Sequence, residues 1–240
     1  RQRQMCIRDS SYTGQEDITE SLGRALISLK GYMNTDQSDV TEQSFDLQIK
    51  NEGFKTASKV QYVAAAGNFV EKGYSYTGVL NVLQVIFSYD YLWINVRVKG
   101  GAYGCMCNFN RIGDAFFTSY RDPNLKRTYE TYKQAAEYVE HFEASDRDML
   151  KYIIGAICKL DAPMTPSAEG AYNYICYLSG ITDEQLQKDR DQILTADVEK
   201  IRELAPYLNA VFSKECIAAL GDEDVIEKEG ALFNEIRSLI

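Results

Sequence analysis

Residues 92–108, LWINVRVKGGAYGCMCN, decide the fold of this chain. A long apolar run from Thr77 to Arg97 ends at Gly100-Gly101, as a glycine-terminated helix does. Residues 102–108 and 114–121 then read as two short strands of a hairpin. The segment therefore predicts a buried core helix that leads directly into a β-hairpin.

The sequence on either side of this segment predicts further strands and helices. Upstream, residues 45–51 and 57–69 alternate apolar and polar side chains as half-buried strands do, with a loop at NEGF between them. Downstream, Asp122 followed by Pro123 predicts the N-cap and first residue of a helix. The remaining signals are capping boxes at Ser145 and Thr182, a cap at Thr195, a strand over 216–220 and an amphipathic helix over 225–240. This order predicts an α+β fold, a mainly antiparallel sheet with helices packed on one face.

The N-terminal part of the chain differs in composition from the rest. Residues 1–10, RQRQMCIRDS, are basic in an otherwise acidic chain and resemble a translated sequencing adapter, so we interpret them as non-native. Residues 11–44 are polar, with one short amphipathic helix, and are interpreted as a linker or the end of a preceding domain. A single domain is therefore expected over residues 45–240.

Composition excludes several classes of partner. The 240 residues carry a net charge of −9, and we expect no nucleic-acid partner because phosphate binding needs clustered Lys and Arg. The most apolar stretch, residues 79–96, is interrupted by Asn81, Gln84, Asp90 and Asn95, which indicates a buried helix and no membrane span. No secretory signal is recognisable and the six cysteines fit reduced thiols, so a cytoplasmic location is expected.

Histidine is the residue type that most restricts the chemistry. His141 is the only one in the sequence, and a zinc site of the H-E-x-x-H type needs two. Cys105 and Cys107 face the same side of a strand, but without a neighbouring histidine we interpret them as core thiols. No metal site is therefore expected in this chain.

The glycine-rich turn after the core helix carries the candidate functional residues. Arg97 places a cation at the helix end, where it complements the helix dipole. Gly100, Gly101 and Gly104 are three glycines in five residues, more than a helix cap needs, and Tyr103 projects from among them. A phosphate-binding nest is another interpretation, but it needs a helix after the turn, where the pattern predicts a strand.

Two motifs in this region resemble a known family. RVKGGAYG at 97–104, together with SYRDPN at 119–124, resembles the last domain of the presequence proteases, a branch of the pitrilysin (insulinase-like) family of zinc metallopeptidases. NEGF at 51–54 and VQYVAAAGNF at 60–69 fit the start of that domain. The resemblance covers about residues 45–240.

The resemblance implies a function for the chain. It would be the C-terminal substrate-binding half-chamber domain of a zinc metalloendopeptidase that degrades unstructured oligopeptides. The zinc motif H-x-x-E-H and the N-terminal catalytic half would lie elsewhere in the same polypeptide. Zinc is thus expected in the full-length enzyme and none in this chain, and the fragment alone is expected to be inactive.

The resemblance also implies roles for individual residues. The last domain of these enzymes lends an Arg and a Tyr to the active site, and the matching positions are Arg97 and Tyr103. Both would bind the peptide, and Tyr103 would support the oxyanion of the transition state. Gly100 and Gly101 would let the backbone approach the substrate.

An alternative is left open by the same resemblance, because pitrilysin-like chains also serve as non-catalytic partner or scaffold subunits. An H-x-x-E-H motif upstream in the same polypeptide distinguishes the two. Arg97 and Tyr103 favour the catalytic interpretation, since a scaffold needs neither. For the catalytic case, the net charge predicts a preference for basic peptides.

Overall fold

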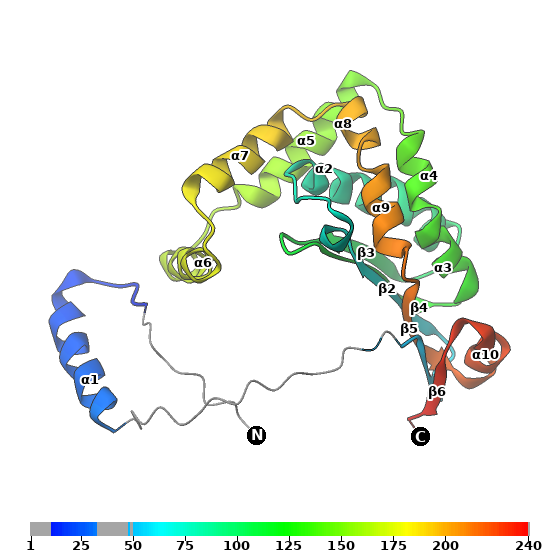
Figure 1. Cartoon of the computed structure of the whole chain (residues 1–240), viewed down its shortest axis with the longest axis horizontal. Coiled ribbons are helices and arrows are strands. Elements are labelled where there is room, and N and C mark those ends of the chain that lie inside the picture. Colours follow the sequence, from blue (N-terminus) through cyan, green and yellow to red (C-terminus); the bar gives the residue numbers. More distant parts are fainter. Residues whose placement is uncertain (1–10, 33–47, 49, 240) are drawn as a thin grey trace. The chain divides into compact units, whose positions relative to one another are not determined.

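The computed structural model describes residues 11–32, 48 and 50–239, which Figure 1 shows in colour. The described residues fall into two compact units. The first unit contains α1 (Thr19–Gly31) and α6 (Pro166–Ser179). The segment 1–10 and the predicted domain boundary near residue 44 lie outside the described residues.

The second unit is built on a six-stranded mixed sheet. The strands are β1 (Glu52–Thr56), β2 (Gln61–Asn68), β3 (Gly104–Phe109), β4 (Asp114–Asp122), β5 (Cys216–Asp222) and β6 (Glu235–Ser238). Their spatial order is β3-β4-β2-β5-β1-β6. The pairs β3–β4, β4–β2 and β2–β5 are antiparallel, whereas β1 runs parallel to both β5 and β6. The sheet is therefore mainly antiparallel, as predicted.

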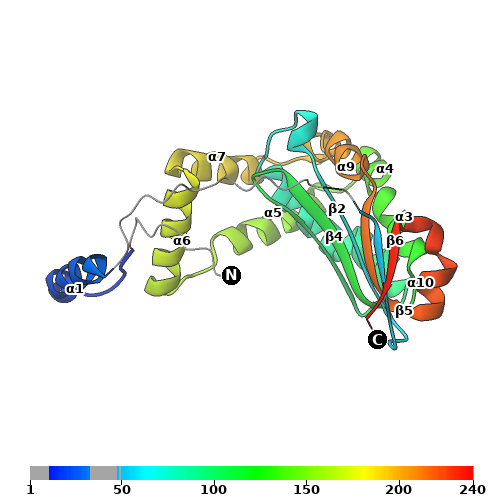
Figure 2. The same cartoon turned by 60° about the horizontal axis from the view of Figure 1, so that its bottom comes forward.

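Helices cover one face of this sheet (Figures 1 and 2). They are α2 (Val79–Ile86), α3 (Lys126–Lys133), α4 (Ala135–Glu140), α5 (Asp146–Leu160), α8 (Val198–Arg202), α9 (Ala205–Phe212) and α10 (Glu223–Lys228); α7 (Asp183–Leu194) precedes α8. Phe117 of β4 marks the centre of the core, because its ring packs against Phe87, Tyr132 and Phe212 at centroid distances of 5.7, 5.7 and 5.1 Å. Three helical segments thus meet one strand residue, and the predicted packing of helices on one face is confirmed.

The opposite face of the sheet is open and apolar. Phe116 on β4, Tyr62 on β2 and Met106 on the edge strand β3 are 38, 44 and 49% exposed on the face away from the helices. Exposed apolar faces of this kind mark surfaces that contact another molecule.

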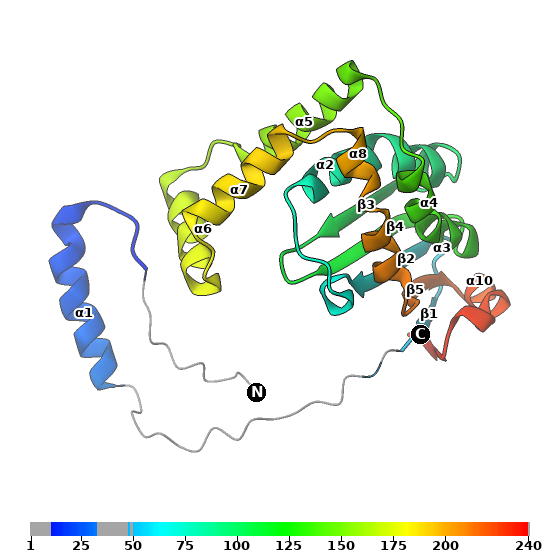
Figure 3. The ribbon, with the colours of Figure 1, turned by 45° about the horizontal axis from the view of Figure 1, so that its top comes forward.

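The core helix continues well beyond α2. It changes to π-helical hydrogen bonding over Phe87–Tyr91 and again over Trp93–Val98, the segments η3 and η4 (its first part, α2, is labelled in Figure 3). The run Val79–Val98 is long and apolar enough to cross a membrane by length and composition. Leu80, Leu83 and Ile86 are at most 1% exposed within the unit, so packing on the sheet accounts for the apolar sequence.

Two sequence predictions at the ends of the unit are wrong. Residues 50–51 of the strand predicted over 45–51 are not in a strand, while 45–47 and 49 lie outside the described residues. Strand β1 instead begins at Glu52 and occupies the segment predicted as the NEGF loop. Pairing with β5 and β6, more than 150 residues away, overrides the local turn signal.

The predicted C-terminal helix over 225–240 is also shorter than expected. Helix α10 ends at Lys228, and residues 235–238 form the edge strand β6. Asn234 fixes this strand, because its N–H donates to the carbonyl of Asn51 at 2.8 Å and its side chain accepts the N–H of Asn51 at 3.0 Å. Such long-range bonds have no signature in a local pattern.

The predicted helix caps have mixed outcomes. The Ser145 hydroxyl accepts the N–H of Asp148, and the Thr182 hydroxyl accepts the N–H of Gln185, so both residues cap their helices as predicted. The Gln185 side chain accepts the N–H of Thr182 at 3.1 Å, which completes the capping box at Thr182. Thr195 is not a cap: Asp197 caps α8 by accepting the N–H of Lys200 at 2.8 Å. The Thr195 hydroxyl instead donates to the backbone carbonyl of Asp191 at 2.8 Å.

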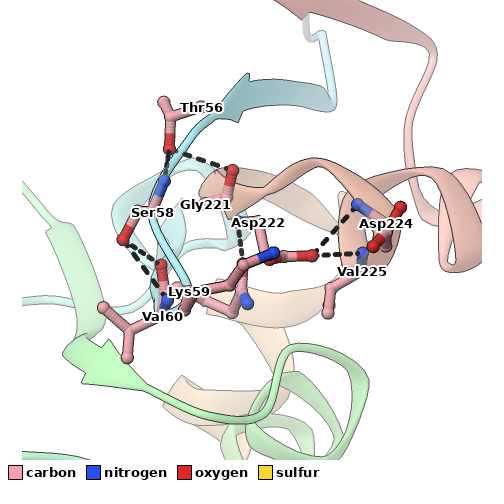
Figure 4. Close-up of polar contacts among 9 residues, drawn as sticks. Thr56, Ser58, Lys59, Val60, Gly221, Asp222, Asp224 and Val225 are labelled. Carbon is pink, nitrogen blue, oxygen red and sulfur yellow. Dashed lines mark hydrogen bonds and ion pairs between the residues drawn. The ribbon is translucent and has the colours of Figure 1, made fainter.

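Asp222 ties the turn between β1 and β2 to the end of β5 (Figure 4). One carboxylate oxygen accepts the N–H groups of Asp224 and Val225 and caps α10, and the other binds the Lys59 ammonium group at 2.7 Å. The backbone N–H of Asp222 donates to buried Gln61 at 2.9 Å. Gln61 in turn pairs in register with Asp122 of β4, so this junction borders the turn that carries the candidate site.

Candidate functional site

The candidate site lies where the core helix passes into β3. The N–H of Lys99 donates to the carbonyl of Ile94 at 2.9 Å, and the N–H of Gly101 donates to Arg97 at 2.8 Å. The N–H of Ala102 donates to the carbonyl of Val96 at 3.2 Å, and Ala102 is 4% exposed. The turn is therefore closed by backbone bonds and anchored by a buried side chain.

Each glycine of the turn has its own geometric reason. Gly101 has φ +82°, a left-handed conformation that disfavours other residues. A Cβ at Gly100 would lie 2.3 Å from the carbonyl oxygen of Val96, and one at Gly104 would lie 2.3 Å from the ring of Tyr120. Backbone geometry thus explains all three glycines, and the contact of Gly100 and Gly101 with substrate stays a prediction.

The S-Y-R-D-P-N motif holds this turn from the other side. Asn124 donates from Nδ2 to the carbonyl of Gly100 at 2.6 Å. Asp122 is fully buried and accepts the N–H of Asn124 at 2.8 Å and the hydroxyl of Thr128 at 2.7 Å. The motif is therefore a brace for the glycine turn.

The prediction that Asp122 caps the next helix is wrong. Asp122 is the last residue of β4, and α3 begins only at Lys126, with Leu125 as its N-cap residue. The Asp122 carboxylate instead accepts the N–H of Asn124 and the hydroxyl of Thr128. The Pro123 ring lies close to Gly101, with its Cγ 3.4 Å from the position that a Cβ on Gly101 would occupy.

Arg97 is exposed in the last turn of the helix, at the end where a cation complements the dipole. Its guanidinium carbon lies 4.0 Å from the centroid of the Trp93 ring, one turn earlier. The guanidinium also offsets part of the effect of burial, which raises the pKa of Cys105 to about 11. Arg97 makes no ion pair with any residue that the structure describes.

Tyr103 projects from the turn into solvent. Its side chain is 60% exposed, and its ring packs edge-on against Tyr120 at a centroid distance of 5.5 Å. Its backbone N–H donates to the carbonyl of Arg121 at 3.3 Å. Within the described part of the chain the hydroxyl has no hydrogen-bond partner, so it is available to a ligand. The turn places Arg97 and Tyr103 at one end of the sheet, with no hydrogen bond or cation–π contact joining them in the described residues.

Sequence reasoning assigned no substrate role to two neighbours, Tyr120 and Arg121, and interpreted Arg121-Asp122-Pro123 as a strand-to-helix turn. Tyr120 supports the Tyr103 ring, and the guanidinium carbon of Arg121 lies 5.9 Å from the centroid of the same ring. Both belong to S-Y-R-D-P-N, where the Asp-Pro pair drew attention to a helix start instead.

Among the described residues, no three His, Cys, Asp or Glu side chains gather as a metal site. Cys107 is buried in the core, and burial raises the pKa of its thiol. His141 is exposed at the end of α4, with Nδ1 3.0 Å from the carbonyl of Glu137 and beside a polar groove. The residues present do not fit a zinc ion.

Comparison with known proteins identifies the family. The family model of the PreP C-terminal domain matches residues 51–221. The chain belongs to the presequence protease C-terminal domain family. The resemblance seen in the sequence is therefore confirmed, and both motifs of the site lie inside the matched range.

Relatives of this presequence protease domain are much longer proteins. The chain is 44% identical over 230 residues to protein HypA of Clostridium perfringens, an alignment that covers 96% of this chain and 24% of HypA. It is 32% identical over 198 residues to presequence protease 1 of Arabidopsis thaliana, covering 81% of this chain and 18% of that protein. The chain spans about a quarter or less of these relatives.

The fold of this presequence protease domain is shared more widely. The crystal structure of pitrilysin superposes with a TM-score of 0.55 at 13% identity, over 85% of this chain and 23% of pitrilysin. At this identity the likeness concerns the fold alone. It agrees with the α+β architecture described above.

Proposed function

We propose that this chain is the substrate-binding C-terminal domain of a presequence-protease-like zinc endopeptidase, and that Arg97 and Tyr103 act on the bound peptide. The observation that carries the proposal is the pair of exposed, uncommitted polar groups on one braced turn. Arg97 has no carboxylate partner and Tyr103 no hydroxyl partner among the described residues. Such groups are ready to bind a ligand without first breaking internal bonds.

The two side chains suit an extended peptide. A guanidinium presents a planar fork of donors that matches backbone carbonyl groups. A phenol hydroxyl donates to a carbonyl oxygen that gains negative charge during peptide-bond cleavage. The brace from Asn124 to Gly100 limits motion of the turn, so the donors are oriented before the peptide arrives.

The open face of the sheet supports the same function. Tyr62, Met106 and Phe116 present an apolar surface beside the turn that carries Tyr103. An unfolded peptide exposes apolar side chains that pack on such a surface. The zinc chemistry belongs to another part of the parent polypeptide, because this chain has no fitting ligands among its described residues.

The test is a hydroxyl deletion in the full-length parent protein. We expect Tyr103→Phe to lower kcat by roughly 10²–10³, the usual effect of losing one oxyanion donor. Tyr89→Phe is a matched control, because Tyr89 is 67% exposed on η3 and lies outside the turn. Equal rates for Tyr103→Phe and the wild type would show that the role of Tyr103 is wrong, and no hydrolysis by the wild-type parent protein would indicate a non-catalytic subunit.

A further inference from the structure

Three cations at or beside the glycine turn form no ion pair among the described residues, although the chain as a whole is acidic. Arg97, Lys99 and Arg121 make no ion pair with any described residue, whereas Lys55 on β1, Arg237 on β6 and Lys59 in the turn after β1 do. The nearest carboxylate in sequence, Asp122, is fully buried and already bound to Asn124 and Thr128. The positive charge of this surface is therefore not neutralised from within the protein.

Arg121 is the most unusual of the three. Its φ is +49°, so an arginine occupies a left-handed conformation that glycine or asparagine adopts at lower cost. Backbone strain of this kind persists where the surroundings impose it, and it is concentrated at functional sites. At this position it directs a charged side chain to the neighbourhood of Tyr103, whose ring lies 5.9 Å from the guanidinium carbon.

The surroundings of Arg121 are fixed independently of its charge. Its carbonyl accepts the N–H of Tyr103, and the next residue, Asp122, is held by the hydrogen bonds of the brace. The side chain itself is exposed. Replacing the guanidinium thus removes a charge from the surface and leaves the bonds that shape the turn.

We propose that Arg121 is a specificity-determining residue that binds a carboxylate of the peptide substrate beside Tyr103. The inference rests on the proposed function, and it adds the chemical class of substrate that the site prefers. A planar guanidinium binds a carboxylate with two parallel hydrogen bonds, and Arg97 and Lys99 add to the local positive charge. The carboxylate belongs either to an acidic side chain or to the C-terminus of the peptide.

This preference is opposite to the one that net charge predicts. A charge of −9 spread over the molecule favours basic peptides, but salt screens such interactions beyond about 8 Å at physiological ionic strength. Groups in direct contact with the substrate therefore determine its preferred charge. At this turn, the charged groups without an ion pair among the described residues are cations.

The experiment measures kcat and KM of the full-length parent protein on four forms of one fluorogenic peptide. One position next to the cleaved bond carries Glu or Gln, and the C-terminus is free or amidated. With the wild type, we expect the preferred carboxylate to lower KM roughly tenfold, the usual effect of a charge-assisted hydrogen bond. In Arg121→Gln this difference in KM should vanish, and Arg121→Lys should restore part of it.

Arg147→Gln is the matched control, because Arg147 is an exposed arginine on α5 without an ion pair in the described residues. If loss of selectivity in Arg121→Gln follows the Glu/Gln pair, the bound group is a side-chain carboxylate. If it follows amidation, the bound group is the C-terminus. Selectivity retained in Arg121→Gln, or no preference for any carboxylate in the wild type, would overturn the inference.

Two further outcomes separate the inference from its foundation. A uniform fall in kcat for all four peptides in Arg121→Gln would mean that the residue only orients Tyr103, which also overturns the specificity role. If Tyr103→Phe is slow but Arg121→Gln keeps its selectivity, the proposed function stands and this inference fails. Thermal unfolding of each variant confirms that it is folded.

Discussion

At the scale of single residues, the site is a turn whose side chains depend on backbone constraints. Gly101 supplies a left-handed φ, Gly104 makes room for the Tyr120 ring, and Asn124 holds the carbonyl of Gly100. Arg97 and Tyr103 make none of these bonds with their side chains. The residues that shape the turn and the residues offered to a ligand are therefore different, and substitutions should separate stability from activity.

Gly101→Ala tests the shaping role. A Cβ at φ +82° costs about 1–2 kcal/mol, so we expect Gly101→Ala to lower the free energy of unfolding by that amount. Gly230→Ala is the control, because its φ is not positive and an added Cβ would make an ordinary contact at 3.5 Å with the side chain of Ile236 on β6. Urea unfolding of the chain measures both. Equal stability of the two variants would contradict the geometry of the turn.

At the scale of secondary structure, local signals predicted most elements and failed where distant strands decide. Glycines at 100–101 end the core helix as expected, and the caps at Ser145 and Thr182 form. The loop predicted at NEGF and the helix predicted over 225–240 failed for one reason. Strands β1 and β6 exist through pairing with each other, which a window of ten residues does not contain.

The site was predicted in part for a similar reason. Arg97 and Tyr103 were found through a motif, and the turn that carries them has the expected helix-to-strand form. Arg121 escaped notice because nothing in a sequence reports a positive φ on an arginine. The brace by Asn124 also escaped notice, since it joins residues 24 positions apart.

The junction at Asp222 gives a pH-dependent prediction. The Lys59 ammonium group lowers the pKa of Asp222 in the folded protein, helped by the N–H groups of Val225 and Asp224. The folded state therefore binds this proton less readily than the unfolded chain does. The resulting stabilisation is fully present above the ordinary pKa of aspartate, about 4, and is lost as pH falls below it.

Asp222→Asn isolates this charge, because asparagine keeps the acceptor that caps α10. We expect the variant to have a lower Tm than the wild type at pH 7, and we expect the gap in Tm to narrow as pH falls through the lowered pKa of Asp222. Lys59→Met should reduce the pH dependence of the wild type in the same direction. Scanning calorimetry from pH 7 to pH 3 measures both, and a constant gap in Tm over that range would contradict the role of the ion pair.

At the scale of the whole molecule, the unit presents two different faces. One is sealed by helices around Phe117, and the other exposes Tyr62, Met106 and Phe116. A domain with its binding groups at the end of an exposed sheet face is suited to contact a second domain across a bound substrate. In the proposed function that second domain belongs to the N-terminal catalytic half of the same polypeptide.

The isolated chain should therefore bind peptide without cleaving it. We expect no hydrolysis of a fluorogenic peptide by the 240 residues, with or without added zinc, because no metal ligands gather among the described residues. The full-length parent protein with zinc is the positive control. Hydrolysis by the purified chain that depends on zinc and survives His141→Gln would contradict this expectation.

The parallel pairing of β1 has a consequence for how the protein is made. Among the strands that the structure describes, Glu52–Thr56 pairs with those that begin at Cys216 and Glu235, more than 150 residues later in the chain. During synthesis this strand leaves the ribosome early and has no partner until almost all of the domain has followed. Contacts so distant in sequence form slowly and leave strand edges exposed in the meantime. The sheet is completed last at the strand that is translated first.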